Sequence, residues 1–146
     1  MRGIIRELGA EGDALADMVV IDLEAGLEHL KRATPEHTDT LLVVAEPYYR
    51  SLETATRTAA LGRELGIAQV GVVANKLRDD RDREWISAVF EPHGLPIMGA
   101  VPFDQTVQEA DRRPAALIDV DPECPAVRAI SSILESVGEG ARLQGD

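Results

Sequence analysis

This sequence has few residues of several kinds, and each scarcity excludes a class of protein. A single cysteine, Cys124, allows no internal disulfide bond and is typical of a reducing compartment. Aromatic residues make up 3% of the chain, so the core has to be built from valine, isoleucine, leucine and alanine. No apolar run approaches the roughly 20 residues of a membrane span. We therefore expect a cytoplasmic protein with no membrane partner.

Basic residues are scarce as well. The chain has 15 lysines and arginines against 26 acidic residues, which gives a formal net charge of −11. This excess of negative charge opposes binding to nucleic acid, so no nucleic-acid partner is expected. Neither of the two lysines, Lys31 and Lys76, follows a glycine. The phosphate-binding pattern G-x-x-x-x-G-K-[ST] therefore does not occur in these 146 residues.

Four short apolar runs are present, separated by segments with helical periodicity. They cover Asp17–Asp22, Thr40–Pro47, Gln69–Lys76 and Ile97–Phe103. The runs are continuous rather than alternating, which is typical of parallel strands that helices cover on both faces. The sequence thus predicts an α/β fold, with residues 1–146 forming one domain around a parallel sheet.

Helix boundaries can be predicted from capping residues. Ser51 is expected to cap a helix that stops near Gly66, and Asp79 or Asp80 to open the next one. Asp104 is expected to cap a short helix. The pair Asp121-Pro122 predicts the start of the last helix.

Parallel α/β sheets bind ligands beyond the carboxyl ends of their strands. In this chain those ends carry Asp22, Glu46-Pro47, Asn75-Lys76 and Pro102-Phe103-Asp104. Asp22 ends an apolar run and precedes a turn that contains Gly26. A carboxylate there can hold Mg²⁺, directly or through water, against a nucleotide phosphate. The alternative is that Asp22 only caps the helix that follows it.

The other strand ends allow two interpretations each. The amide of Asn75 can bond both N6 and N7 of adenine, or it can simply form the turn that ends its strand. Arg78 stands where a guanine-specific N-K-x-D pattern has a carboxylate, which disfavours guanine. Phe103 can stack on a base or belong to the core, and Asp104 can line a base pocket or only cap a helix.

Two other kinds of site find little support. No serine-histidine-aspartate set or pair of catalytic carboxylates can be placed. The potential metal ligands have no zinc-site spacing and fall in different segments; they are Glu28, His29, His37, His93 and Cys124.

The segment Asp22–His29 reads D-L-E-A-G-L-E-H and resembles the switch II segment of MinD/ParA-like (SIMIBI) P-loop ATPases. Its D-x-E-A-G-x-E-H form is most similar to the carbon monoxide dehydrogenase accessory ATPases, which serve nickel insertion. Further matches follow in the same order along the chain: Glu46-Pro47, Ser51, Thr54-Ala55, Val73–Lys76, Pro102–Asp104 and Ala110-Asp111.

This resemblance implies the C-terminal part of a CobQ/CobB/MinD/ParA-type nucleotide-binding domain, a P-loop NTPase fold lacking its N-terminal strands. It implies that Asp22 is the carboxylate that holds Mg²⁺ through water, with Glu24 and Gly26 in switch II. Asn75-Lys76 and Pro102–Asp104 would contact the base of ATP or ADP. It also implies a homodimer and a metalloenzyme client.

The chain departs from the family in its missing parts. In the family, the phosphate loop and a C-x-C metal pair precede the switch II strand, and neither occurs here. The phosphate-loop strand of the family lies between the runs that correspond to Asp17–Asp22 and Thr40–Pro47. We therefore expect a fragment or short form that does not hydrolyse ATP alone.

Two other functions are compatible with the sequence. One is a pseudo-NTPase module that uses its sheet only as a scaffold for interactions. The other is a receiver-like domain with Asp22 as phosphoacceptor, which Lys76 fits but which has no hydroxyl residue at Ala45-Glu46.

Overall fold

The computed structural model describes residues 19–23, 38–112 and 114–144. The helices and strands follow one another in this order: β1 (Thr40–Ala45), α3 (Tyr49–Glu64), β2 (Gln69–Leu77), α4 (Asp80–Phe90), the 3₁₀ helix η2 (Glu91–His93), β3 (Ile97–Pro102), α5 (Gln105–Ala110), α6 (Leu117–Val120) and α7 (Pro125–Gln144).

The three strands form one parallel sheet in the order β1-β2-β3. β1 pairs with β2 in uninterrupted register from Thr40 opposite Gln69 to Ala45 opposite Ala74. The strands predicted at Thr40–Pro47, Gln69–Lys76 and Ile97–Phe103 are confirmed, each to within two residues. The predicted α/β class is confirmed with them.

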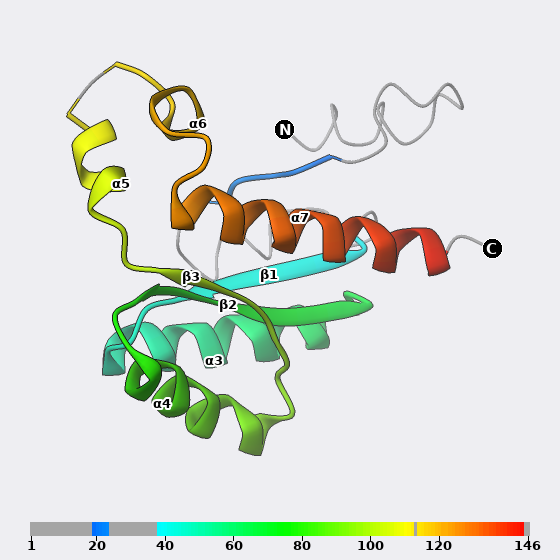
Figure 1. Cartoon of the computed structure of the whole chain (residues 1–146). Helices are drawn as coiled ribbons and strands as arrows, with labels where there is room; N and C mark the ends of the chain where they lie inside the picture. The colour runs from blue at the N-terminus through cyan, green and yellow to red at the C-terminus, as the bar shows by residue number, and fades with distance from the viewer. Residues whose placement is uncertain (1–18, 24–37, 113, 145–146) are drawn as a thin grey trace.

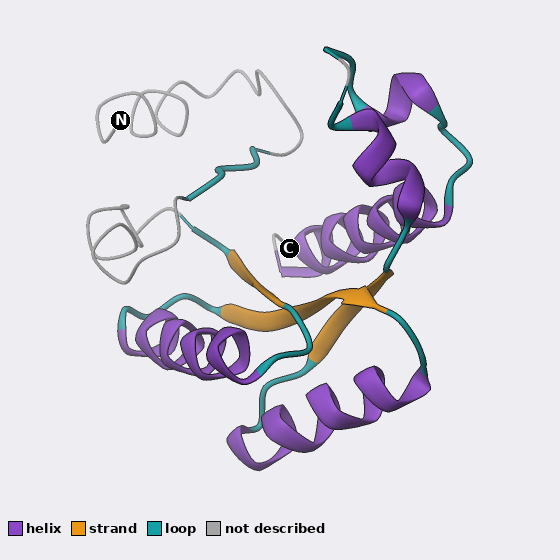
Figure 2. Ribbon diagram, turned by 90° about the vertical axis from the view of Figure 1, so that its left-hand side faces the viewer, coloured by secondary structure: helices purple, strands orange, loops and turns teal. Residues whose placement is uncertain are grey.

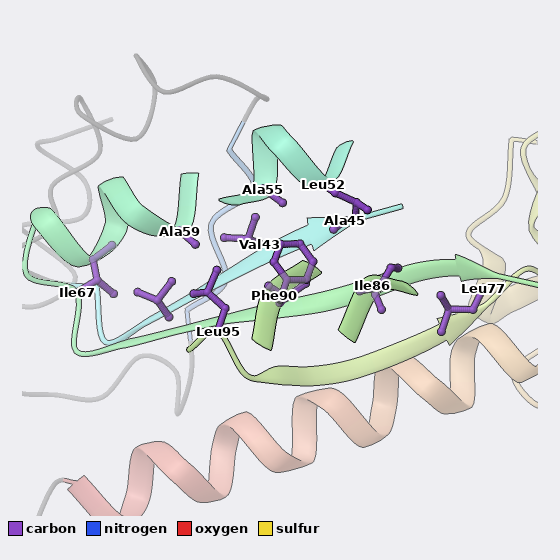
Figure 3. Packing of buried hydrophobic residues seen from close by; sticks show 13 residues of the cluster. Val43, Ala45, Leu52, Ala55, Ala59, Ile67, Leu77, Ile86, Phe90 and Leu95 are labelled. Atoms are coloured by element: carbon purple, nitrogen blue, oxygen red, sulfur yellow. The ribbon is translucent and has the colours of Figure 1, made fainter. Parts of the chain in front are cut away.

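Helices cover both faces of the sheet, as the continuous apolar runs predict (Figure 1). On one face, α3 and α4 bury a cluster that includes Leu52, Ile86 and Phe90 (Figure 3). On the other face, α7 packs on the sheet through Ala126 and Ile133. Figure 2 shows the same layers after a quarter turn. Because the three strands are parallel, they all end at the same edge of the sheet, which we call the carboxyl edge.

Two of the predicted caps are confirmed and one is wrong. Asp79 caps α4 by accepting hydrogen bonds from the backbone N–H groups of Arg81 and Asp82, and Asp104 caps α5. Ser51 does not cap α3, which begins after Tyr48. Instead the Ser51 hydroxyl oxygen accepts a hydrogen bond from the Glu46 backbone N–H at 2.9 Å.

The predicted start of the last helix is also wrong. α7 begins at Pro125, three residues after Pro122, and the one-turn helix α6 precedes it. The carboxylate of Asp121 accepts a hydrogen bond from the Glu123 backbone N–H at 3.1 Å. The acidic residue therefore stabilises the turn between the helices, which the sequence signal does not distinguish from a helix start.

The strand predicted at Asp17–Asp22 is wrong for residues 19–22. These residues are extended but lie outside the sheet, and Val20 is 79% exposed (Figure 1). Leu23 packs against the core cluster of α3 and α4. A strand is defined by its ladder partner, and among the described residues β1 pairs only with β2. An apolar run by itself does not supply that partner.

Candidate functional site

β2 bulges where it reaches the carboxyl edge. Its Ala74 lies opposite Ala100 and its Leu77 opposite Pro102, so β2 advances three residues while β3 advances two. Lys76, inside this bulge, has a φ of 58°, in the left-handed region that few residues other than glycine adopt. Such bulges are common beside active sites, where they turn a side chain in a new direction.

An ion pair joins this bulge to the end of β1. The ammonium of Lys76 donates to Oε1 of Glu46 at 2.8 Å. This hydrogen bond and the charge of Glu46 raise the pKa of Lys76, against a smaller opposing effect of burial. The backbone of Glu46 is fixed as well, because its N–H donates to Ser51 and its carbonyl oxygen accepts from the Tyr48 N–H at 2.7 Å.

Asn75 is half-buried next to the ion pair. Its Oδ1 accepts a hydrogen bond from the backbone N–H of Lys76 at 3.0 Å. A carbonyl oxygen has a second lone pair, and Nδ2 of Asn75 donates to no group in the described part of the chain. Asn75 therefore stabilises the turn and still has one acceptor site and two donor hydrogens for a ligand.

Phe103 follows β3 at the same edge and is not part of the core, since 41% of it is exposed. Its backbone N–H donates to the Leu77 carbonyl oxygen at 2.7 Å, which ties it to the end of β2. The guanidinium carbon of Arg78 lies 5.7 Å from the centroid of its ring. This distance is within the range of a cation–π contact.

Asp104 connects two helices. One carboxylate oxygen accepts from the Thr106 N–H at 2.9 Å, in the first turn of α5. The other accepts from the Ala126 N–H at 3.2 Å, at the start of α7. These hydrogen bonds, that of the Thr106 backbone first among them, lower the pKa of Asp104 despite the opposing effect of burial. The thiol of buried Cys124 also contributes to lowering the pKa of Asp104.

The other predicted site residues are placed differently. Pro102 is the last residue of β3 and half-buried, whereas Asp22 is exposed in the extended segment 19–23. No hydrogen bond within the described residues joins Asp22 to Asn75 or Phe103. Glu24 and Gly26 lie outside the described residues. Among the residues that are described, no group of three or more histidine, cysteine or acidic side chains could hold a metal ion.

Comparison with curated proteins yields relatives named as a carbon monoxide dehydrogenase accessory protein and as an ATP-binding protein. The chain is 38% identical over 124 residues to the carbon monoxide dehydrogenase accessory protein CooC of Rhodospirillum rubrum, covering 84% of this chain and 46% of that protein. It is also 38% identical over 112 residues to an uncharacterized ATP-binding protein of Methanocaldococcus jannaschii, covering 76% of this chain and 42% of the relative. The chain is a homologue of the MinD/ParA-like ATP-binding proteins. No protein-family model matches it.

Solved MinD structures show the same fold. MinD of Aquifex aeolicus superposes with a TM-score of 0.75 at 20% identity, covering 99% of this chain and 59% of that one. MinD of Pyrococcus horikoshii, determined in complex with Mg-ADP, gives 0.75 at 21% identity, covering 99% and 58%. This chain spans about half the length of the curated relatives that it matches. No described helix has the length and apolar content needed to cross a membrane.

Sequence reasoning about this MinD/ParA-like homologue missed two contacts at the carboxyl edge. The first is the Glu46–Lys76 ion pair, and the second is the packing of Arg78 over Phe103. A signal for the first was present, since residues of opposite charge lie at the carboxyl ends of two strands that are adjacent in a parallel sheet. No comparable signal exists for the second, because the separation of Arg78 and Phe103 depends on the bulge in β2.

Proposed function

We propose that this chain provides the base-binding edge of an ATP site in a MinD/ParA-like ATPase of the metalloenzyme-maturation type. The observation that carries the proposal is that Asn75, Arg78 and Phe103 gather at the carboxyl edge of a parallel sheet, where such folds bind ligands. The free acceptor and donor positions of Asn75 match N6–H and N7 of adenine.

The side chains beside Asn75 suit a stacked base. Phe103 offers an exposed ring, and the guanidinium of Arg78 lies over that ring. Aromatic rings and guanidinium planes are the groups on which bases stack in proteins. Pro102 and Asp104 flank Phe103, and the hydrogen bonds of Asp104 to α5 and α7 hold this turn in place.

The phosphate side of the site rests on fewer residues. Asp22 is an exposed carboxylate, and Mg²⁺ commonly binds through one or two carboxylates together with water and nucleotide phosphates. Asp22 therefore fits a water-mediated contact to Mg²⁺, which would neutralise phosphate charge when bound. Glu24 and Gly26 stay assigned to the switch segment by resemblance. Similarity to an accessory protein of carbon monoxide dehydrogenase supports a metalloenzyme client, and the family likeness supports a homodimer.

Titration with an ATP analogue labelled on its ribose tests the base-binding role, because the adenine edge stays free. In the presence of Mg²⁺ we expect saturable binding that unlabelled ATP displaces better than GTP. Asn75→Ala should weaken binding about tenfold, which corresponds to about 1.4 kcal/mol. Gln69→Ala is the matched control, since it removes an amide from the amino end of the same strand. Equal affinities of the two variants would contradict the proposal.

The second part of the proposal is that the chain alone does not turn over ATP. The 146 residues do not contain the G-x-x-x-x-G-K-[ST] pattern, whose backbone N–H groups bind the phosphates in P-loop NTPases. A phosphate-release assay should show no hydrolysis above the buffer rate. Turnover that Asp22→Asn abolishes would overturn this part, while leaving the adenine contact to be judged by the titration.

A further inference from the structure

We infer that Glu46 and Lys76 are positioning residues that aim the amide of Asn75 at the base, and that Lys76 is not itself a nucleotide ligand. This inference rests on the proposed function for the identity of the ligand. It differs from the sequence-based interpretation, which placed Lys76 in contact with the nucleotide. The contacts of the bulge in β2 support it.

The first support is the geometry of the bulge. A regular strand would direct Asn75 and Lys76 to opposite faces of the sheet. The extra residue of β2 and the left-handed backbone of Lys76 interrupt that alternation immediately after Asn75. The Lys76 N–H then points back and donates to Oδ1 of Asn75, which restricts rotation of the amide.

The second support is that the left-handed backbone of Lys76 needs an external restraint. A non-glycine residue in this region is strained, because its Cβ comes too close to the following carbonyl oxygen. The ion pair to Glu46 opposes this strain from the neighbouring strand, at a separation of 2.8 Å. Glu46 is itself fixed by backbone hydrogen bonds with Ser51 and Tyr48, so it offers a rigid anchor.

The third support is that the Lys76 ammonium is already engaged. It pairs with Glu46, and the hydrogen bond to that carboxylate raises the pKa of Lys76, which favours the charged ammonium. The ammonium keeps two further donor hydrogens, but its charge is already offset by the Glu46 carboxylate, which also repels a phosphate that approaches it. The structure instead places the charge between β1 and β2, where it joins the two strand ends next to Asn75.

The order of the Asn75 side chain can be measured directly, because Asn75 is the only asparagine in the sequence. Selective ¹⁵N-asparagine labelling gives a single pair of side-chain amide signals in NMR, and relaxation measurements report how ordered that amide is. In the unmodified protein we expect an ordered amide. In Glu46→Gln its order parameter should fall below about 0.6, the range of flexible groups.

Three further variants separate positioning from simple stabilisation. Glu53→Gln is the matched control, because Glu53 forms an ion pair of 2.7 Å with Arg57 on α3, and it should leave the Asn75 amide unchanged. Lys76→Gly relieves the backbone strain, so it should melt near the normal temperature and still lose amide order. The charge reversal Glu46→Lys with Lys76→Glu should restore order that each single change removes.

The same variants can be titrated with the ribose-labelled ATP analogue, using ATP and ITP as competitors. ITP carries an oxygen in place of the adenine amino group, so it tests the contact to Asn75. Glu46→Gln should reduce the preference for ATP over ITP at least threefold, and Glu53→Gln should not. If the unmodified protein binds no nucleotide, the proposed function fails while the NMR comparison still decides the positioning role. An Asn75 amide equally ordered in Glu46→Gln and in the unmodified protein overturns the inference.

Discussion

Replacing Asp104 by alanine should destabilise the protein more than the loss of an ordinary helix cap. Its carboxylate accepts from the Thr106 N–H in α5 and from the Ala126 N–H in α7. Removing an aspartate cap costs about 1 kcal/mol per helix. With two helix starts affected, we expect a loss of about 2 kcal/mol in the free energy of unfolding, or about 4–8 °C in Tm for a protein of this size.

Urea unfolding followed by circular dichroism measures this loss. The matched control is Asp79→Ala, because Asp79 also accepts two backbone hydrogen bonds, but both from the first turn of α4. It should therefore cost about 1 kcal/mol. A loss in Asp104→Ala no larger than that in Asp79→Ala would refute the idea that Asp104 joins the two helices.

The destabilisation caused by Asp104→Ala should also depend on pH. The native pKa of Asp104 lies below its ordinary value of 3.8, since hydrogen bonds to the backbone N–H of Thr106 and then of Ala126 favour the charged form. The stability that the ionised Asp104 carboxylate contributes is thus fully present above the pKa of this residue in the unfolded chain. It is lost as the pH falls through the pKa of Asp104 in the folded protein. The difference in stability between the unmodified protein and Asp104→Ala should be constant from pH 7 to about 5 and shrink below about pH 4. A difference that grows as the pH falls would contradict this assignment.

Two further substitutions test the packing of the helices around the sheet. Gly99→Ala should cost about 1–3 kcal/mol, because a Cβ there would overlap the side chain of Ile133 on α7, and Ile133→Ala in the same protein should recover part of the loss in a urea titration. No recovery in the double variant would show that the cost has another origin. Arg63→Ala should cost about 1 kcal/mol, since its guanidinium donates to the carbonyl oxygens of His93 at 2.8 Å and Gly94 at 2.6 Å. Arg57→Ala, which removes an exposed ion pair on the same helix, should cost less than about 0.5 kcal/mol, and equal losses in these two variants would argue against the Arg63 contact.

Three strands and two helix caps could be predicted from the sequence because their signals are local. Continuous apolar runs mark strands that are buried on both faces, and β1, β2 and β3 all occur where those runs do. Asp79 and Asp104 satisfy N–H groups that a helix start always leaves open. These signals depend only on nearby residues and not on which distant segments pack against them.

The predictions that failed concern residues whose partners are distant or ambiguous. The run ending at Asp22 has the composition of a strand, yet residues 19–22 have no ladder partner among the described residues. Ser51 lies at the start of a helix, but its hydroxyl bonds to the backbone of Glu46 instead of capping. In each case the local sequence is compatible with both the predicted and the observed arrangement.

The candidate site was predictable in position but not in detail. The carboxyl ends of the strands could be located, and with them Asn75, Phe103 and Asp104. The second hydrogen bond of Asp104 could not, because it crosses to Ala126, 22 residues away. The opposite charges of Glu46 and Lys76 are visible in the sequence, but their pairing depends on β1 and β2 being neighbours and on the bulge of β2 opposite β3.

We propose that adenine binds at the carboxyl edge of this sheet. The most direct measurement is a titration of the ¹⁵N-labelled protein with MgADP, in which each backbone amide is followed by NMR. We expect shifts concentrated in residues 75–78 and 103–106, together with the single Asn75 side-chain amide pair. Shifts confined to the amino ends of the strands, or no saturable shift at millimolar nucleotide, would contradict it.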